Sequence, residues 1–296
     1  MNSGLGNYRL SGALGSSWYA LPMLGFACAI IVGSLYSVVA VYLPYRGSYR
    51  MFLPVVFAGG LGAMVWWTLR ASKCRNLLFA IFMGLLISMV AIYAMWAMFV
   101  FMLVRRDTLG VDGDKSVSLF SIWSHPAAVW ESAKDISIFG WYAINGYTTS
   151  GWKLWAMWAA EAGLFVIVIL WGACGAIWKR VYCERCGVWC HHDGTVLRVA
   201  LSSDEMLHHR LMDGDASVLR ELPAVEADVR PHLAIDLDCC DECSDMATMS
   251  WKLVGADKEI LDTRFVDRRL IAGPEVAELV ALGEKKAEDG ETGSDR

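Results

Sequence analysis

The chain has 296 residues, 56% of them hydrophobic and 14 of them Trp, and its mean hydropathy of +0.40 exceeds what soluble domains usually show. Before residue 179 there are 11 Lys and Arg against 6 Asp and Glu, and from residue 179 onward 15 against 25, so the two parts carry formal charges of about +5 and −10. This division predicts a membrane protein with an acidic soluble part, and it argues against a nucleic-acid partner, because phosphates are bound by clustered Lys and Arg.

Residues 1–16 are polar and rich in Gly and Ser, and we expect a disordered N-terminus there. Lipid offers the backbone no hydrogen-bond partners, so an apolar stretch of roughly 20 residues crosses a bilayer as a helix. Four stretches without Lys or Arg meet this condition: residues 17–42, 51–69, 77–104 and 154–178. We therefore predict an all-α four-helix transmembrane bundle over residues 17–178, whose first span is retained rather than cleaved as a signal peptide.

Small residues recur along the first two spans. Gly25, Ala29 and Gly33 follow one another at four-residue spacing, and the second span contains the sequence AGGLGA from Ala58 to Ala63. Small residues let helix backbones approach closely in lipid. We expect these surfaces to hold the bundle together; the alternative is that they join two copies of the chain in a homo-oligomer.

The orientation is predicted from Lys and Arg, which concentrate on the cytoplasmic side of membranes. With the N-terminus inside, seven of these residues flank the spans on each side, so the raw count is a tie. The sequence RASKCR, residues 70–75, places three cations within six residues, whereas the cations of loop 105–153 are mixed with acids. This density favours cytoplasmic N- and C-termini, and the compact design suits a bacterial plasma (inner) membrane.

The loop over residues 105–153 contains a helical pattern from His125 to Tyr142. Pro126 fits a first helical turn, and small or apolar residues recur at helical spacing in a region rich in Trp. Because Trp prefers the headgroup level of a bilayer, we expect an amphipathic helix lying on the outer surface. The alternative is a small extracytoplasmic cap packed on the bundle.

Glu161 is the ionisable residue within a predicted span. Carboxylates inside a membrane are costly and suggest a function such as an ion or proton path. Trp155 and Trp158 nearby mark an interface, so Glu161 can instead have a structural partner or reach water. No second buried acid, His or Lys accompanies it in the spans, which weakens a transport function.

The soluble part contains two pairs of cysteines at a spacing typical of metal sites. Cys183 and Cys186 form one C-x2-C pair, and Cys240 and Cys243 form the other. Each pair places two thiolates on one tight turn, and two facing turns complete a tetrahedral zinc site. Gly187 suits such a turn because glycine tolerates positive φ. The sequence therefore predicts a structural Zn²⁺ bound by these four cysteines.

The two pairs resemble the knuckles of zinc-ribbon domains, and the resemblance covers residues 183–243 only. It implies a metal-stabilised interaction or scaffold module. Patterns of short strands and helices predict a soluble α+β zinc-ribbon-like domain over residues 179–284, and the composition predicts a disordered acidic tail over residues 285–296. The 53 residues between the pairs exceed the usual gap of small ribbons, so an inserted subdomain must fill it.

Strand patterns place the remaining two cysteines of this region in the core. Cys239 shares one face of a predicted strand with Leu233, Ile235 and Leu237. Cys190 falls in a segment that we expect to form a hairpin through an Asp193–Gly194 turn, opposite Leu197.

Three other uses of the cysteines are open. Disulfides would fit an extracytoplasmic location, and Cys183 with Cys186 would fit a redox pair. A catalytic zinc would need an open coordination position and a nearby base, which these histidines could supply: His191, His192, His208 and His209.

The leading hypothesis is a non-enzymatic, multi-pass membrane protein that presents a zinc-stabilised cytoplasmic module to a protein partner. No Walker, dinucleotide-binding, G-x-S-x-G or H-E-x-x-H motif points to an enzyme. The alternatives are a transporter or channel component that uses Glu161 and a membrane-bound thiol oxidoreductase that uses Cys183 and Cys186.

Overall fold

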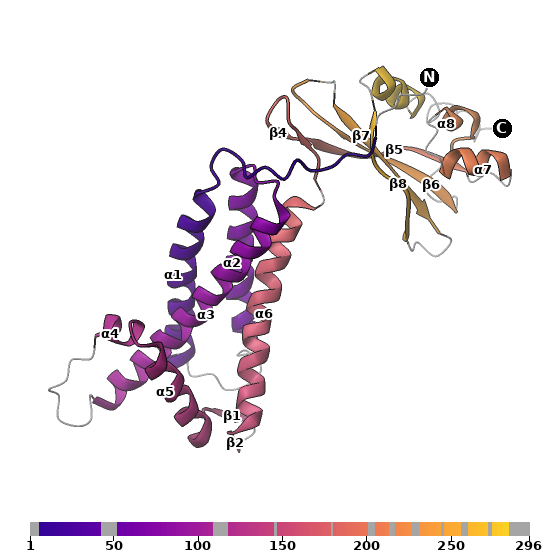
Figure 1. Ribbon diagram of the computed structural model, residues 1–296. Coiled ribbons are helices and arrows are strands. Elements are labelled where there is room, and N and C mark those ends of the chain that lie inside the picture. Colours follow the sequence, from indigo (N-terminus) through magenta and orange to yellow (C-terminus); the bar gives the residue numbers. More distant parts are fainter. Residues whose placement is uncertain are drawn as a thin grey trace. The chain divides into compact units, whose positions relative to one another are not determined.

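The structure is a computed structural model and describes residues 6–42, 52–108, 118–144, 147–178, 180–200, 205–212, 217–225, 231–243, 246–255, 260–271 and 274–283. The chain divides into two compact units. One comprises Ser11–Lys179, and the other comprises Arg180–Arg296 together with Met1–Leu10. The first unit is built around long helices and the second around an antiparallel sheet (Figure 1).

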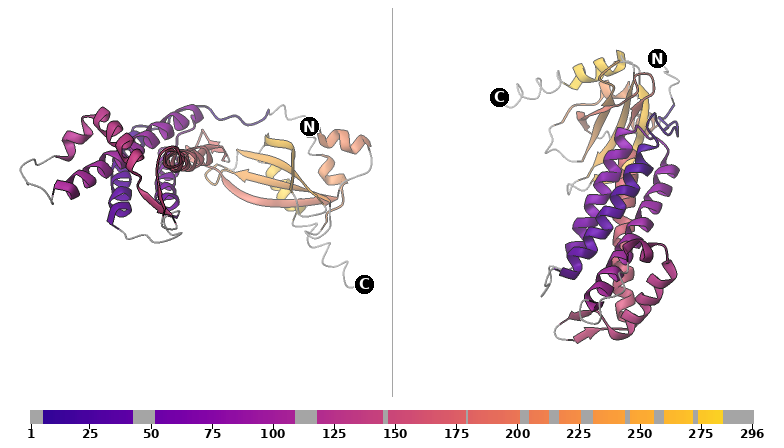
Figure 2. Two further views of the ribbon diagram at one scale, coloured as in Figure 1. Left: turned by 90° about the horizontal axis from the view of Figure 1, so that it is seen from below. Right: turned by 90° about the vertical axis from the view of Figure 1, so that its left-hand side faces the viewer.

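Four long apolar helices form the first unit, as the hydropathy predicts. They are α1 (Ala20–Tyr42), α2 (Phe52–Ala71), α3 (Leu77–Thr108) and α6 (Trp152–Ile177). Each is long and apolar enough to cross a membrane, which suggests a multi-pass membrane protein. Figure 2 shows these helices from two further directions.

Close backbone contacts hold these helices together in two pairs, α1 with α3 and α2 with α6. On α1, Gly25, Ala29 and Gly33 are buried. A Cβ atom added to Gly33 would lie 2.3 Å from the carbonyl oxygen of Ala91, and one added to Gly172 of α6 would lie 2.4 Å from that of Gly62. Small residues at these positions therefore let the helix backbones touch within the chain.

Two short helices and a hairpin lie between α3 and α6: α4 (Leu119–Trp123), α5 (Pro126–Phe139), β1 (Tyr142–Ile144) and β2 (Tyr147–Thr149). Helix α5 starts with Pro126 and buries Val129, Ala133 and Ser137. Val129 packs with residues of α3. The location of α5 at a membrane surface stays a prediction.

The second unit contains a four-stranded antiparallel sheet in the order β5–β6–β7–β8. Its strands are β5 (His191–Ala200), β6 (His232–Cys239), β7 (Ala247–Val254) and β8 (Ile260–Ile271). A small two-stranded ribbon, β3 (Tyr182–Cys183) with β4 (Val188–Trp189), precedes the sheet. The short helices are α7 (Glu205–Met212), α8 (Val218–Glu221) and a further helix over residues 274–283.

The core of this unit lies on one face of the sheet. Alternate residues of β6, namely Leu233, Ile235 and Leu237, pack there with Trp251 of β7, which is fully buried. Helix α8 and the helix over residues 274–283 contribute Leu219 and other apolar side chains to the same cluster. The apolar alternation along β6 therefore has the predicted role.

The expected hairpin through Asp193–Gly194 is wrong. These two residues lie within β5, which runs on to Ala200 and pairs with β6. Gly194 has φ +76°, and the register with β6 shifts there. The positive φ therefore produces a bulge in one strand instead of a two-residue turn, because the neighbouring backbone of β6 supplies the hydrogen-bond partners. Cys190 consequently lies just before β5 and does not face Leu197.

The contact between α1 and α3 gives a first testable prediction. Gly33→Ala should destabilise the helical unit by about 1–3 kcal/mol, because the new methyl group overlaps the backbone of Ala91. Gly60→Ala is the matched control, since its Cβ meets no atom within 4 Å. Thermal unfolding of the detergent-solubilised chain measures both; equal Tm values for the two variants would contradict this account of the packing.

Candidate metal centre

The first cysteine pair lies on the tight turn between β3 and β4. Cys183 ends β3, and the turn over residues 184–187 carries Cys186. The N–H of Gly187 donates to the carbonyl oxygen of Cys183 at 2.9 Å, and Gly187 has φ +70°. A residue with a Cβ rarely adopts this φ, so glycine at this position allows the backbone to form the tight turn. The turn places both thiols on the same side.

The second pair follows the end of β6. Cys239 is the last residue of that strand, and the N–H of Cys240 donates to the carbonyl oxygen of Met246 at 3.1 Å. This hydrogen bond closes the connection between β6 and β7 beside Cys240. Cys243 lies within the same connection.

The structure brings the four predicted cysteines together. The Sγ atoms of Cys183, Cys186, Cys240 and Cys243 all lie within 4.8 Å of one another, and those of Cys183 and Cys243 are 3.7 Å apart. Four sulfurs around one tetrahedral zinc ion would be separated by roughly 3.8 Å, given a Zn–S distance near 2.3 Å. All four are free thiols. The cluster is thus compatible with a zinc-knuckle-like site.

Apolar packing shields the cluster from water. Cys183 and Cys240 are buried, and Cys186 and Cys243 are half-buried. Val181 and Cys190 are buried in the same cluster.

Burial and mutual proximity keep the cysteine protons in place when no cation is present. Burial raises the pKa of Cys183, and hydrogen bonds with Cys240 and Cys243 raise it further. The pKa of Cys186 is raised chiefly by its hydrogen bond with Cys243. A bound cation reverses this balance by stabilising the thiolates. The arrangement therefore fits a cation-holding site better than a set of reactive thiolates.

The two other cysteines of this unit also have raised pKa values. Burial raises the pKa of Cys190 to about 12, with Cys240 and Cys183 as further causes. Burial raises the pKa of Cys239 to about 12 as well, followed by its hydrogen bond with Asp193. Neither belongs to the four-sulfur group.

The histidines considered as catalytic-zinc ligands lie outside this group within the described part of the chain. Nδ1 of His192 is 3.0 Å from Oδ1 of Asp238, so the side chain of His192 is paired with a carboxylate of β6. The side chain of His191 is largely exposed and lies 3.9 Å from the carboxylate of Asp193. His209 is exposed on α7, and the side chain of His208 lies outside the described residues.

One contact beside the cysteines could not be predicted from the sequence. The hydroxyl of Tyr8 accepts from the N–H of Tyr182 at 3.0 Å and donates to its carbonyl oxygen at 3.4 Å. The backbone of residues 6–8 pairs with β8, where the N–H of Tyr8 donates to the carbonyl oxygen of Arg268 at 2.8 Å. We expected disorder over residues 1–16. Residues 1–5 lie outside the described residues, whereas residues 6–8 form a β-bridge with β8, and Tyr8 lies beside the first cysteine turn.

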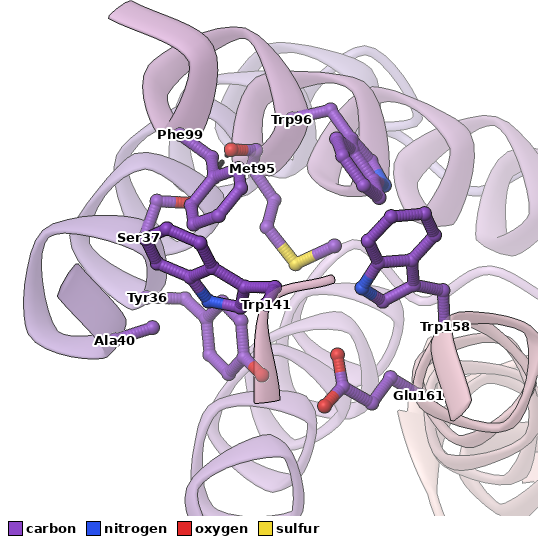
Figure 3. Close-up of a pocket in the computed structure, with 9 residues that line it drawn as sticks. All are labelled: Tyr36, Ser37, Ala40, Met95, Trp96, Phe99, Trp141, Trp158 and Glu161. Carbon is purple, nitrogen blue, oxygen red and sulfur yellow. Dashed lines mark hydrogen bonds between the residues drawn. The ribbon is translucent and has the colours of Figure 1, made fainter. Parts of the chain in front are cut away.

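Glu161, the predicted intramembrane site residue, lies on α6 and is half-buried. Its carboxylate points into a small cavity between α1, α3 and α6 (Figure 3). It is not part of the four-cysteine group.

The raised thiol pKa values predict how metal uptake depends on pH. Thiols that hold their protons must release them to bind a cation, so affinity should rise with pH, by about two or more protons per metal ion between pH 6 and 8. Zn²⁺ competition against a chromophoric chelator measures this slope on the full chain. An affinity that does not change with pH would contradict the proton-coupled thiol site.

The Tyr8 contact predicts a local effect. Tyr8→Phe removes both hydrogen bonds to Tyr182 and should destabilise the first cysteine turn by about 1 kcal/mol. Hydrogen exchange followed by mass spectrometry should show faster exchange in a peptide covering residues 181–190. Tyr19→Phe, at a side chain that is 55% exposed, is the control. Unchanged exchange in the Tyr8 variant would show that the contact between Tyr8 and Tyr182 does not stabilise the turn.

No family model, no curated protein and no solved structure matches this chain. The case for a metal centre therefore rests on the positions of its own four sulfurs. Their spacing along the chain predicts a metal site, and their convergence in space is compatible with one.

Proposed function

We propose that this chain is a multi-pass membrane protein whose soluble module is closed by one structural Zn²⁺ and serves as a non-enzymatic interaction or scaffold module. The observation that carries the proposal is the convergence of the four sulfurs within 4.8 Å of one another. Soft thiolate ligands favour zinc over hard cations such as Mg²⁺ and Ca²⁺. Four protein ligands fill a tetrahedral shell, which is typical of structural rather than catalytic zinc.

The position of the cluster in the fold supports a structural role. The ion would tie the β3–β4 turn to the connection between β6 and β7, which is about 60 residues away in the sequence. The cross-link would also secure the end of the sheet at which β6 and β7 meet, because Cys239 pairs with Ala247 there. Zinc binding of this kind contributes directly to folding free energy.

The distribution of charge along the chain supports the proposed setting. The part of the chain from residue 179 onward has 15 Lys and Arg against 25 Asp and Glu, which suits a protein partner and disfavours nucleic acid. The three cations within residues 70–75 favour the cytoplasmic side for both termini. We therefore propose that the module and both termini are cytoplasmic, in a bacterial plasma membrane, and that the module binds a protein partner.

A thiol oxidoreductase has less support. Redox-active cysteines have a lowered pKa, because the thiolate is the attacking species. Burial raises the pKa of Cys183, and its neighbours raise that of Cys186.

Metal analysis of the purified full chain tests the proposal. We expect about one zinc per chain, and Cys186→Ser or Cys243→Ser should lose it and lower the Tm of the soluble unit by roughly 10 °C or more, since the binding energy is folding energy. Cys239→Ala is the matched control, because Cys239 precedes Cys240 but lies outside the four-sulfur group. A wild-type chain without zinc, or one unaffected by chelator, would refute the proposal, as would equal zinc loss from the Cys239 variant.

A further inference from the structure

An apolar groove lies on the helical unit where α2 and α6 pack together. Small residues of both helices line it, among them Gly62 and Gly172, at which the two backbones touch. Trp66 of α2 and Trp171 of α6 line it as well. The groove is open on one side, and the centre of a water-sized sphere can occupy about 380 Å³ of it. A single water needs ~10–15 Å³ by that measure, so the groove has room for a larger group.

The groove would face the interior of a bilayer. Both helices are long and apolar enough to cross a membrane, and all the residues that line the groove are apolar. Side chains of the lining are exposed, with values of 38% for Trp66, 61% for Ile167 and 78% for Trp171. An empty hollow would deprive these side chains of dispersion contacts. In a membrane we therefore expect either an acyl chain or a helix of a second copy to cover the groove.

The length of the groove-lining face of α2 matches one leaflet of a bilayer. Gly59, Ala63, Trp66 and Arg70 follow one another at spacings of four, three and four residues, so they lie on the same face of that helix. The distance along the helix from Gly59 to Arg70 is about 16 Å, at 1.5 Å per residue. Half of a hydrocarbon core is ~15 Å thick. Arg70, in the last turn of α2, is therefore at the depth of a lipid headgroup.

The charge at this end of the groove is positive. The guanidinium carbon of Arg70 lies over the ring of Trp66, 4.8 Å from its centroid, which places the cation beside the groove. A guanidinium group presents its N–H donors in a planar fork that matches a phosphate. Residues 52–76 contain three cations, Arg70, Lys73 and Arg75, and no Asp or Glu. Basic clusters at the ends of membrane helices attract anionic lipid headgroups.

The same charge disfavours a second copy of the chain in the groove. A two-fold axis along the membrane normal would place the same end of both copies at the same depth. The cations of residues 70–75 from both copies would then approach one another, and like charges across an interface repel. An acyl chain brings no such charge and, being thin and flexible, can follow the small residues between Trp66 and Trp171.

We propose that the groove between α2 and α6 binds an acyl chain of an anionic phospholipid whose phosphate lies at Arg70. The site rests on the membrane location that the four apolar helices suggest. It lies wholly within Ser11–Lys179 and does not depend on the metal centre of the other unit.

Native mass spectrometry of the full chain in detergent, stripped of endogenous lipid, tests the proposal. Phosphatidylglycerol and phosphatidylcholine with identical acyl chains are titrated separately. We expect one phosphatidylglycerol per chain to bind about fivefold or more tightly than phosphatidylcholine, because the anionic headgroup meets Arg70. Glycerophosphoglycerol, which has the headgroup without acyl chains, should not displace it. Equal affinities for the two lipids, or displacement by the deacylated headgroup, would overturn the proposal.

Two neighbouring glycines separate the groove from the rest of α2. Gly59→Leu should reduce phosphatidylglycerol affinity by about fivefold or more, because Gly59 lines the groove and the new side chain fills part of it. Gly60→Leu is the matched control, since Gly60 does not line the groove. A Cβ added to either glycine meets no atom within 4 Å, and both changes raise helix propensity equally. Equal affinities of the two variants would overturn the proposal.

A charge variant tests the headgroup contact. Arg70→Gln should remove most of the preference for phosphatidylglycerol over phosphatidylcholine, because it removes the cation beside the groove. Arg105→Gln is the control, since Arg105 is exposed near the opposite end of the bundle, late in α3. A preference that persists in Arg70→Gln would overturn the assignment of the phosphate. If that variant does not fold, the two glycine variants still decide.

The same spectra identify the other occupant. A lipid adduct of the single chain supports the proposal. A two-chain species that Gly59→Leu breaks and Gly60→Leu leaves intact would overturn it, because a second copy would then cover the groove. Zinc content is a separate readout: a chain without zinc that still binds phosphatidylglycerol would refute the metal centre and support this site. A chain that stays soluble without detergent would refute the membrane location and this site with it.

Discussion

In the second unit, two turns that lie far apart in the sequence bring four sulfur atoms together. The sheet brings the turns together. His191 pairs with Cys239, so Cys190, just before β5, and Cys240, just after β6, also become neighbours. The β3–β4 turn comes directly before this point in the chain and adds Cys183 and Cys186. The register of the strands thus brings the four sulfur atoms together. A shared cation would stabilise the thiolates and so lower the raised pKa values of Cys183 and Cys186.

The helical unit is held by a different constraint, which is the closeness of its backbones. Gly33 against Ala91 and Gly172 against Gly62 leave no space for a Cβ atom. Near the cavity beside Glu161 the packing changes in character, because large rings in edge-to-face contact replace the small residues. Rings that cannot fill space as closely as aliphatic chains leave a gap, and Glu161 extends into it. The same bundle therefore contains close glycine contacts between helix backbones and edge-to-face contacts between aromatic rings.

Features with a local signature could be predicted from the sequence. Unbroken apolar stretches predicted the four long helices, and the alternation of apolar residues predicted which face of β6 packs in the core. The C-x2-C spacing predicted the four cysteines that come together. Features that depend on distant partners could not. Asp193–Gly194 has the sequence of a turn but pairs with β6 in the structure, and residues 6–8 form a β-bridge with β8, which is distant in the sequence. The cavity beside Glu161 combines residues of three helices, so only the Glu161 side chain itself was visible in the sequence.

X-ray absorption spectroscopy at the zinc K-edge of the full chain, purified without added metal, tests the central claim most directly. The account predicts a single shell of four sulfur ligands at about 2.3 Å, the distance typical of zinc thiolates. Nitrogen or oxygen atoms in that shell, or fewer than four sulfurs, would show that Cys183, Cys186, Cys240 and Cys243 do not share one ion.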